Sequence, residues 1–198
     1  SEEFSGDMLL VRDIIIKYIQ RGIMRYDIAN EGYTIAGLEK DVDWQCPISN
    51  GRMVNLSGRA DRIDRRADGS LQIIDYKSGN TPHLEYNGME ALFRGGAQER
   101  VSNIFQTMLY SMILHRKYKL ESCPSLYFAS KMLNDDYSPL ILDRTTGAYV
   151  ERFSDISEEF ESELNATLEE LFDYSTPFRQ TEDEDMCKYC DFKKICRR

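Results

Sequence analysis

The chain opens with apolar residues at helical spacing. Residues 7–29 repeat them every three or four positions, which predicts an amphipathic helix packed on the surface of the fold. Charged and polar residues interrupt the run, so it is neither a signal peptide nor long enough to span a bilayer. The apolar positions are Leu9, Ile15, Ile16, Ile19 and Ile23.

Three β-prone segments follow, over residues 33–48, 53–65 and 71–77. The turn signal Ala67-Asp68-Gly69 separates the last two segments, so they are expected to pair as an antiparallel hairpin. Together the three segments predict an antiparallel meander at the centre of a sheet.

Helices and strands alternate through the second half of the chain. We predict a loop or short helix over 83–96, a helix over 98–117, strands over 124–131 and 147–153, and an acidic helix over 157–174. This order predicts an α/β fold in which helices flank a central mixed sheet.

Length and composition limit the class of protein. A chain of 198 residues suits one domain, and 41% hydrophobic residues can build an ordinary core. The five cysteines are an odd number, and three of them crowd into residues 187–196, with nothing that resembles a secretory signal. This pattern indicates metal or cluster binding in a reducing cytoplasm better than it indicates a disulfide framework.

The hairpin gathers reactive side chains. Pairing centred on Asp68 places Asp61 opposite Asp75, and side chains directly opposite in an antiparallel pair lie about 4.5–5.5 Å apart at Cβ. Lys77 is two residues beyond Asp75 and so shares its face. Facing carboxylates repel each other, and a divalent cation would remove that cost. From spacing alone, a solvated face of mixed charge is an equally good interpretation.

Magnesium suits this set of ligands. Mg²⁺ is often held by one or two carboxylates plus waters and phosphate oxygens, and here the backbone carbonyl of Tyr76 offers a further ligand. Such an ion can generate hydroxide and stabilise charge on a phosphodiester. Lys77 is positioned to orient the attacking water or to bind the scissile phosphate.

Two motifs in this hairpin resemble a known family. Residues 58–64, Gly-Arg-Ala-Asp-Arg-Ile-Asp, and residues 74–79, Ile-Asp-Tyr-Lys-Ser-Gly, are similar to the G-x-x-D-R-I-D and D-Y-K-T/S-G signature of RecB-type nuclease domains. These belong to the PD-(D/E)XK superfamily and occur in RecB, AddB and CRISPR-associated exonucleases. The resemblance implies a restriction-endonuclease-like core, with Asp61 and Asp75 as ligands of Mg²⁺ or Mn²⁺ and Lys77 as the catalytic lysine. Asp64 is expected to be structural, paired with a nearby arginine.

The resemblance extends to a helix. Residues 106–110, Gln-Thr-Met-Leu-Tyr, resemble the Q-x-x-x-Y motif of the same family. Gln106 and Tyr110 are four residues apart and share a helical face, which in the family borders the active site. A helix with one polar edge is the ordinary alternative. Glu39 matches a glutamate often found before the hairpin, which makes it a weaker candidate.

The cysteine tail over residues 176–198 also resembles the family. Cys187, Cys190 and Cys196 have the spacing with which AddB-type and CRISPR-associated members bind a [4Fe–4S] cluster, and zinc is the competing interpretation. The family's fourth cysteine and a helix histidine both precede the hairpin. Neither Cys46 nor Cys123 matches the position of the family's fourth cysteine, and both are expected in the core. We therefore expect an N-terminally truncated fragment of a longer protein, in which the cluster is absent or incomplete and cleavage is poor or absent, or a natural variant that is inactive.

The resemblance implies a metal-dependent DNA exonuclease domain of a helicase–nuclease that acts in double-strand-break repair. Its expected partners are DNA and a helicase-like region of the same polypeptide or of a partner subunit, with no membrane. A net charge of −9 argues mildly against nucleic-acid binding, although a nuclease needs only a local basic strip. The alternatives are a stand-alone CRISPR-associated or phage-type exonuclease and a catalytically inactive DNA-binding or scaffold module.

Overall fold

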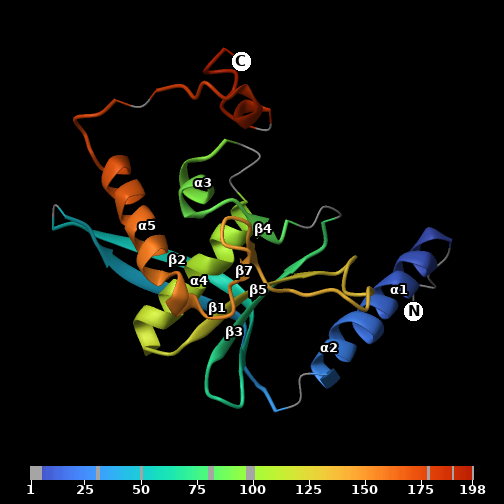
Figure 1. Ribbon diagram of the computed structural model, residues 1–198. Coiled ribbons are helices and arrows are strands. Elements are labelled where there is room, and N and C mark those ends of the chain that lie inside the picture. Colours follow the sequence, from blue (N-terminus) through green and yellow to red (C-terminus); the bar gives the residue numbers. More distant parts are fainter. Residues whose placement is uncertain are drawn as a thin grey trace.

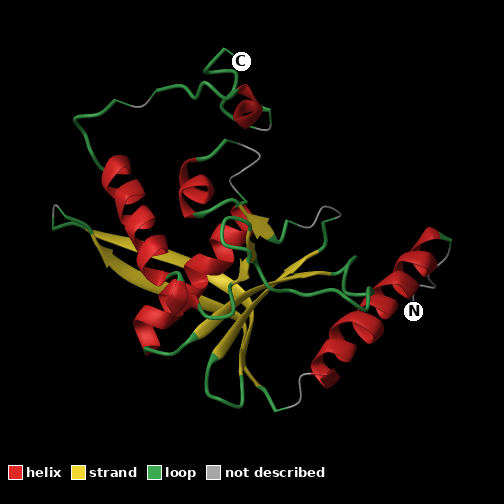
Figure 2. Ribbon diagram, in the orientation of Figure 1, coloured by secondary structure: helices red, strands yellow, loops and turns green. Residues whose placement is uncertain are grey.

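A computed structural model describes residues 6–29, 32–49, 51–79, 83–96, 101–177, 179–188 and 190–197. Helices lie around a central β-sheet, as Figure 2 shows. The elements are α1 Asp7–Lys17, α2 Met24–Ala29, β1 Thr34–Pro47, β2 Met53–Arg65, β3 Leu71–Lys77, β4 Glu85–Tyr86, α3 Met89–Arg94, α4 Ser102–Tyr118, β5 Ser122–Phe128, β6 Leu142–Asp143, β7 Ala148–Tyr149 and α5 Ser157–Leu171.

The central sheet is mixed, with strand order β1-β2-β3-β5. The first three strands form the predicted antiparallel meander, and β5 returns parallel to β3 after the crossover through α4. The predicted α/β class and the central mixed sheet are confirmed. A second, small sheet of β4, β6 and β7 lies beside it (Figure 1).

The two faces of the sheet carry separate apolar clusters. Ile73 belongs to the larger cluster, which is built with α3, α4 and α5, whereas the next residue, Ile74, belongs to a smaller cluster with Ile23 and Tyr127. Because successive strand residues point to opposite faces, α4 covers one face and the C-terminal part of the first helical segment covers the other. We call these the α4 face and the α2 face.

The β2–β3 register is the one predicted from the turn. Arg65 pairs with Leu71 and Arg62 with Ile74, which is symmetric pairing about Asp68. The turn closes through a bond from Gly69 N to Arg66 O, and Gly69 takes the positive φ of 84° that glycine adopts at low cost. The type and length of a hairpin turn fix the register, that is, which residues of the two strands face each other along the hairpin.

The N-terminal helix forms as predicted, but its predicted packing is wrong. Helical structure runs from Asp7 to Ala29 with a π-helical stretch over Tyr18–Ile23, yet α1 buries none of its residues. Leu9, Ile15, Ile16 and Ile19 are between 37% and 50% exposed, and only Ile23 of the predicted apolar stripe packs against the sheet. The helix runs past the edge of the sheet, so only its last turns reach the α2 face (Figure 1).

Two later strands differ from the prediction. The strand predicted over 124–131 is β5 over Ser122–Phe128, because a turn starts directly after Phe128. The strand predicted over 147–153 shrinks to β7 at Ala148–Tyr149, followed by a 3₁₀ turn that buries Phe153 in the core. No described helix is long and apolar enough to cross a bilayer.

Candidate active site

The candidate site lies where the β2–β3 ladder ends. Arg62 and Ile74 form the last paired position, and the next residues along the same register are Asp61 and Asp75. At this point the backbone N–H of Tyr76 donates to Asp61 Oδ2 at 2.7 Å. The Asp61 carboxylate is therefore held beside β3 by its Oδ2 atom, which leaves Oδ1 for another ligand.

Asp75 is a buried carboxylate with unused capacity. The residue is 3% exposed, and its Oδ2 lies 2.6 Å from Lys77 Nζ. The distance is that of an ion pair, but the angles at the two atoms are unfavourable for a hydrogen bond. Asp75 Oδ2 is therefore buried without accepting a hydrogen bond. Burial raises the pKa of Asp75 above its ordinary value, the Asp61 charge adds to the rise, and Lys77 offsets it only in part.

Helix α4 supplies the side chains on the other side of Lys77. Lys77 Nζ donates to Gln106 Oε1 at 3.2 Å, and Gln106 Nε2 donates to Tyr110 Oη at 2.8 Å. The ammonium of Lys77 has three donors, and its hydrogen bond to Gln106 together with its ion pair to Asp75 leaves at least one of them for another group. The structure thus brings together all five side chains that the sequence singled out, namely Asp61, Asp75, Lys77, Gln106 and Tyr110.

The donor set fits a hard divalent cation. A buried carboxylate oxygen that accepts no hydrogen bond, next to a second carboxylate and close to the Tyr76 backbone, matches the few oxygen ligands that Mg²⁺ takes from protein. Within the described ranges, no three or more His, Cys, Asp or Glu residues gather as a metal site. Two carboxylates suffice for Mg²⁺, because water and phosphate oxygens complete its shell.

Glu39 stands near this pair but does not join it. It falls in β1 between Leu38 and Lys40, whose partners on β2 are Arg62 and Ala60. Its φ of 46° is a left-handed conformation that is uncommon outside glycine, and its side chain is exposed. The structure therefore gives Glu39 a strained backbone close to Asp61 and no demonstrated ligand role.

The sequence profile of the PD-(D/E)XK nuclease superfamily matches residues 4–197. The chain belongs to this superfamily. No curated protein sequence matches the chain significantly. The mixed α/β core, with its central mixed sheet flanked by helices, agrees with the fold of this superfamily.

The PD-(D/E)XK hairpin has a second set of buried polar groups on the α2 face. Arg62 Nε bonds Asp64 at 2.9 Å, its two terminal nitrogens reach Asp27 at 3.0 and 3.2 Å, and Nη1 also reaches the hydroxyl of Tyr76. The predicted structural role of Asp64, paired with an arginine, is confirmed in geometry. Burial alone lowers the pKa of Arg62, but its bonds to Asp64 and Asp27 outweigh burial and raise it.

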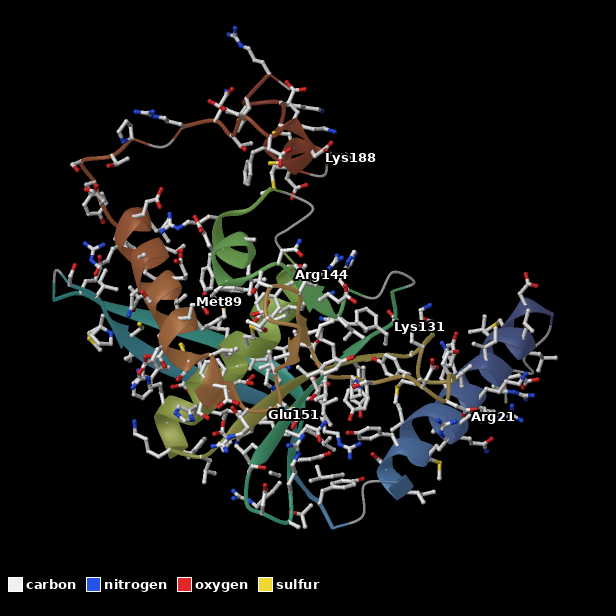
Figure 3. The ribbon with its side chains drawn as sticks, in the orientation of Figure 1. Arg21, Met89, Lys131, Arg144, Glu151 and Lys188 are labelled. Atoms are coloured by element: carbon white, nitrogen blue, oxygen red, sulfur yellow. The ribbon has the colours of Figure 1, made fainter. Side chains whose placement is uncertain are left out.

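The cysteines divide into two groups. Cys46 and Cys123 are buried in the core, as expected, and burial raises the pKa of both thiols. Cys187, Cys190 and Cys196 lie half-buried on the C-terminal segment, whose position apart from the sheet is marked by Lys188 in Figure 3. In the described part of the tail these three thiols do not converge as a metal site. The geometry gives no support for a cluster, and the cluster expected in a full-length protein stays a prediction.

Two residues that shape the site were not predicted from the sequence, Arg62 and Gly58. Arg62 entered the prediction only as part of a motif, although on the α2 face its guanidinium bonds Asp27 of α2 and Tyr76 of β3 and so connects both to β2. Gly58 was likewise named only as a residue of the motif, although it packs against the ring of Tyr110. The available signal was their place in the same seven-residue motif as Asp61, but which groups they touch depends on segments far away in the sequence.

Proposed function

We propose that this chain is a DNA nuclease domain that hydrolyses phosphodiester bonds with Mg²⁺ or Mn²⁺. The observation that carries the proposal is the buried Oδ2 of Asp75, which is ion-paired with the ammonium of Lys77 but accepts no hydrogen bond of good geometry. Native proteins rarely leave a buried carboxylate oxygen without a hydrogen bond unless it has a ligand or a chemical role. Asp61 Oδ1, Asp75 Oδ2 and the Tyr76 carbonyl are the proposed ligands.

Each side chain has a distinct task in this proposal. When bound, the metal supplies Lewis acidity and lowers the pKa of a water. Asp61 is held in place by Tyr76 N–H, and Asp75 is held by Lys77. The remaining donor of Lys77 Nζ orients the attacking water or neutralises a phosphate oxygen. Gln106 and Tyr110 fix the direction of that ammonium through their hydrogen bonds.

We infer the finer context from the motifs. The two hairpin motifs and the helix motif favour a RecB-type exonuclease domain that works with a helicase in double-strand-break repair. The exposed apolar residues of α1 support contact with further protein, because a helix that is apolar on most sides is normally covered. Such a partner would also supply the DNA grip that a net charge of −9 does not. The free cysteines agree with a reducing cytoplasm.

The test is a cleavage assay on linear duplex and single-stranded DNA, with and without Mg²⁺. We expect slow, Mg²⁺-dependent formation of products by the wild-type chain and none by Asp75→Asn, which keeps the shape of the side chain and removes its charge. The matched control is Asp43→Asn, the same chemical change at an exposed residue paired with Lys117 at 3.0 Å. Cleavage that survives in Asp75→Asn would overturn the assignment.

The cysteine tail needs its own experiment. We propose that Cys187, Cys190 and Cys196 hold a [4Fe–4S] cluster only in a longer protein that provides the fourth ligand. Anaerobic purification of such a protein should give the visible absorbance of an iron–sulfur cluster, and Cys190→Ser should remove it. Stoichiometric zinc in a colourless protein would instead favour the competing metal.

A further inference from the structure

Gly58 lies directly under the ring of Tyr110. A Cβ atom at this position would stand 2.4 Å from Tyr110 Cε1, 2.7 Å from its Oη and 2.8 Å from its Cζ. Carbon atoms do not approach so closely without displacement. Gly58 is not among the glycines with positive φ, so its backbone is open to any residue. The position therefore requires glycine for space and not for conformation.

The ring that rests on Gly58 begins a chain of contacts that ends at the candidate active site. Tyr110 is 5% exposed, and its hydroxyl accepts from Gln106 Nε2. Gln106 then presents Oε1 to Lys77, whose ammonium contacts Asp75. Lysine can only donate, so the amide of Gln106 has one orientation that satisfies both neighbours. The hydroxyl of Tyr110 stabilises that orientation by accepting from the amide nitrogen.

We propose that Gly58 is a positioning residue for Lys77. Its missing side chain lets Tyr110 lie against β2, which places the Tyr110 hydroxyl where it holds Gln106 and, through Gln106, the ammonium. An alanine at this position pushes the ring outward by a substantial fraction of an ångström, and the hydroxyl moves with it. The proposal rests on the proposed nuclease function and adds to it the residue that sets the geometry of its lysine.

The kinetic test is a double-mutant cycle in the full chain. Gly58→Ala should lower kcat by about 10²-fold at unchanged KM, because misplacement near 1 Å costs roughly that much. In a Tyr110→Phe background the hydroxyl link is already gone, so Gly58→Ala should reduce kcat less than about two-fold further. The ring is still present in that background, so the loss of thermal stability caused by Gly58→Ala should persist.

A matched glycine controls for the strand itself. Gly37→Ala is a glycine-to-alanine change on β1, where the three atoms nearest to the new Cβ belong to the exposed side chain of Lys40, at 3.2 to 3.7 Å, so a shift of a few tenths of an ångström accommodates it. It should leave kcat within about two-fold of wild type. An equal fall of kcat for Gly58→Ala in both Tyr110 backgrounds would overturn the proposal, as would a fall in stability with kcat unchanged.

A measurement without activity separates this inference from the proposed function. The side-chain amide resonance of Gln106, assigned with Gln106→Ala, should shift in Gly58→Ala and in Tyr110→Phe, and should stay in place in Gly37→Ala. If the wild-type chain fails to cut DNA but the resonance shifts as expected, the nuclease function fails and the positioning contact stands. If the resonance does not move in Gly58→Ala, the positioning role fails whatever the activity.

Discussion

Asp64 and Asp75 are both 3% exposed and lie on neighbouring strands of one hairpin, but they differ in what surrounds them. Asp64 is on the α2 face in a hydrogen-bonded ion pair with Arg62, which also bonds Asp27. Asp75 is on the α4 face with its Oδ2 buried and lacking a hydrogen-bond partner, and its pKa is raised. On the α2 face the carboxylate of Asp64 is paired and hydrogen-bonded, whereas on the α4 face Asp75 Oδ2 remains available to bind a ligand.

The difference separates stability from chemistry. A buried charge is tolerable when it is paired and fully hydrogen-bonded, so the Arg62 group holds the strands and α2 together. A buried carboxylate without full pairing weakens the fold and is retained where a ligand or reaction uses it. Changes on the α4 face should therefore affect activity first, and changes on the α2 face should affect stability first.

The largest expected effect is on catalysis. Lys77→Met should reduce cleavage by about 10²–10⁴-fold, since a group that positions or activates the attacking water contributes on that scale. The melting temperature should fall less than it does on loss of Arg62, because the side chain of Lys77 is 23% exposed and Asp75, whose pKa is already raised by burial, can take up a proton when the cation is removed. Steady-state kinetics and thermal denaturation of the same sample would check this, and loss of both together would contradict the comparison.

The next effect is on stability, from the opposite face. Arg62→Met should destabilise the fold by about 3–5 kcal/mol, because it leaves the buried Asp64 and the partly buried Asp27 without their cation. Arg59→Met is the matched control, since Arg59 pairs with Asp41 at the surface and exposed pairs of this kind contribute little to stability. Denaturant unfolding measures both variants, and equal losses would show that burial of the pair is unimportant.

Metal binding should stabilise the fold through the α4 face alone. At ten times its Kd, free Mg²⁺ should add about 1.4 kcal/mol to the free energy of unfolding of the wild-type chain. Asp75→Asn should lose this gain, whereas Asp43→Asn should keep it. Thermal denaturation against Mg²⁺ concentration is the measurement, and a gain that persists in Asp75→Asn would place the ion elsewhere.

The smallest effect is a gain in stability without metal. The folded state raises the pKa of Asp75, so the ionised carboxylate makes the fold less stable at neutral pH. Asp75→Asn should therefore be more stable than wild type at pH 7. The difference should shrink as the pH falls toward about 3.9, the ordinary pKa of aspartate, because both chains then carry a neutral side chain. A difference that grows on acidification would contradict the assigned direction.

Local sequence predicted the hairpin and its chemistry well. The turn at Ala67-Asp68-Gly69 sets the register by itself, so placing Asp61 next to Asp75 needed no knowledge of distant segments. The four-residue spacing of Gln106 and Tyr110 likewise put both on one face of α4. The cysteine tail shows the limit of such reasoning, because its spacing alone did not bring the three thiols together in the described residues.

Tertiary structure decided how the same residues are used. The hydrogen bonding of each carboxylate depends on distant helices. Asp27 of α2 bonds Arg62 across 35 residues of sequence, and Gln106 of α4 bonds Lys77 across 29. The exposure of α1 depends on where the helix leaves the sheet, which its own apolar pattern does not encode. Local interactions fix dihedral angles and register over a few residues, whereas burial and pairing are set by which distant segments pack against them.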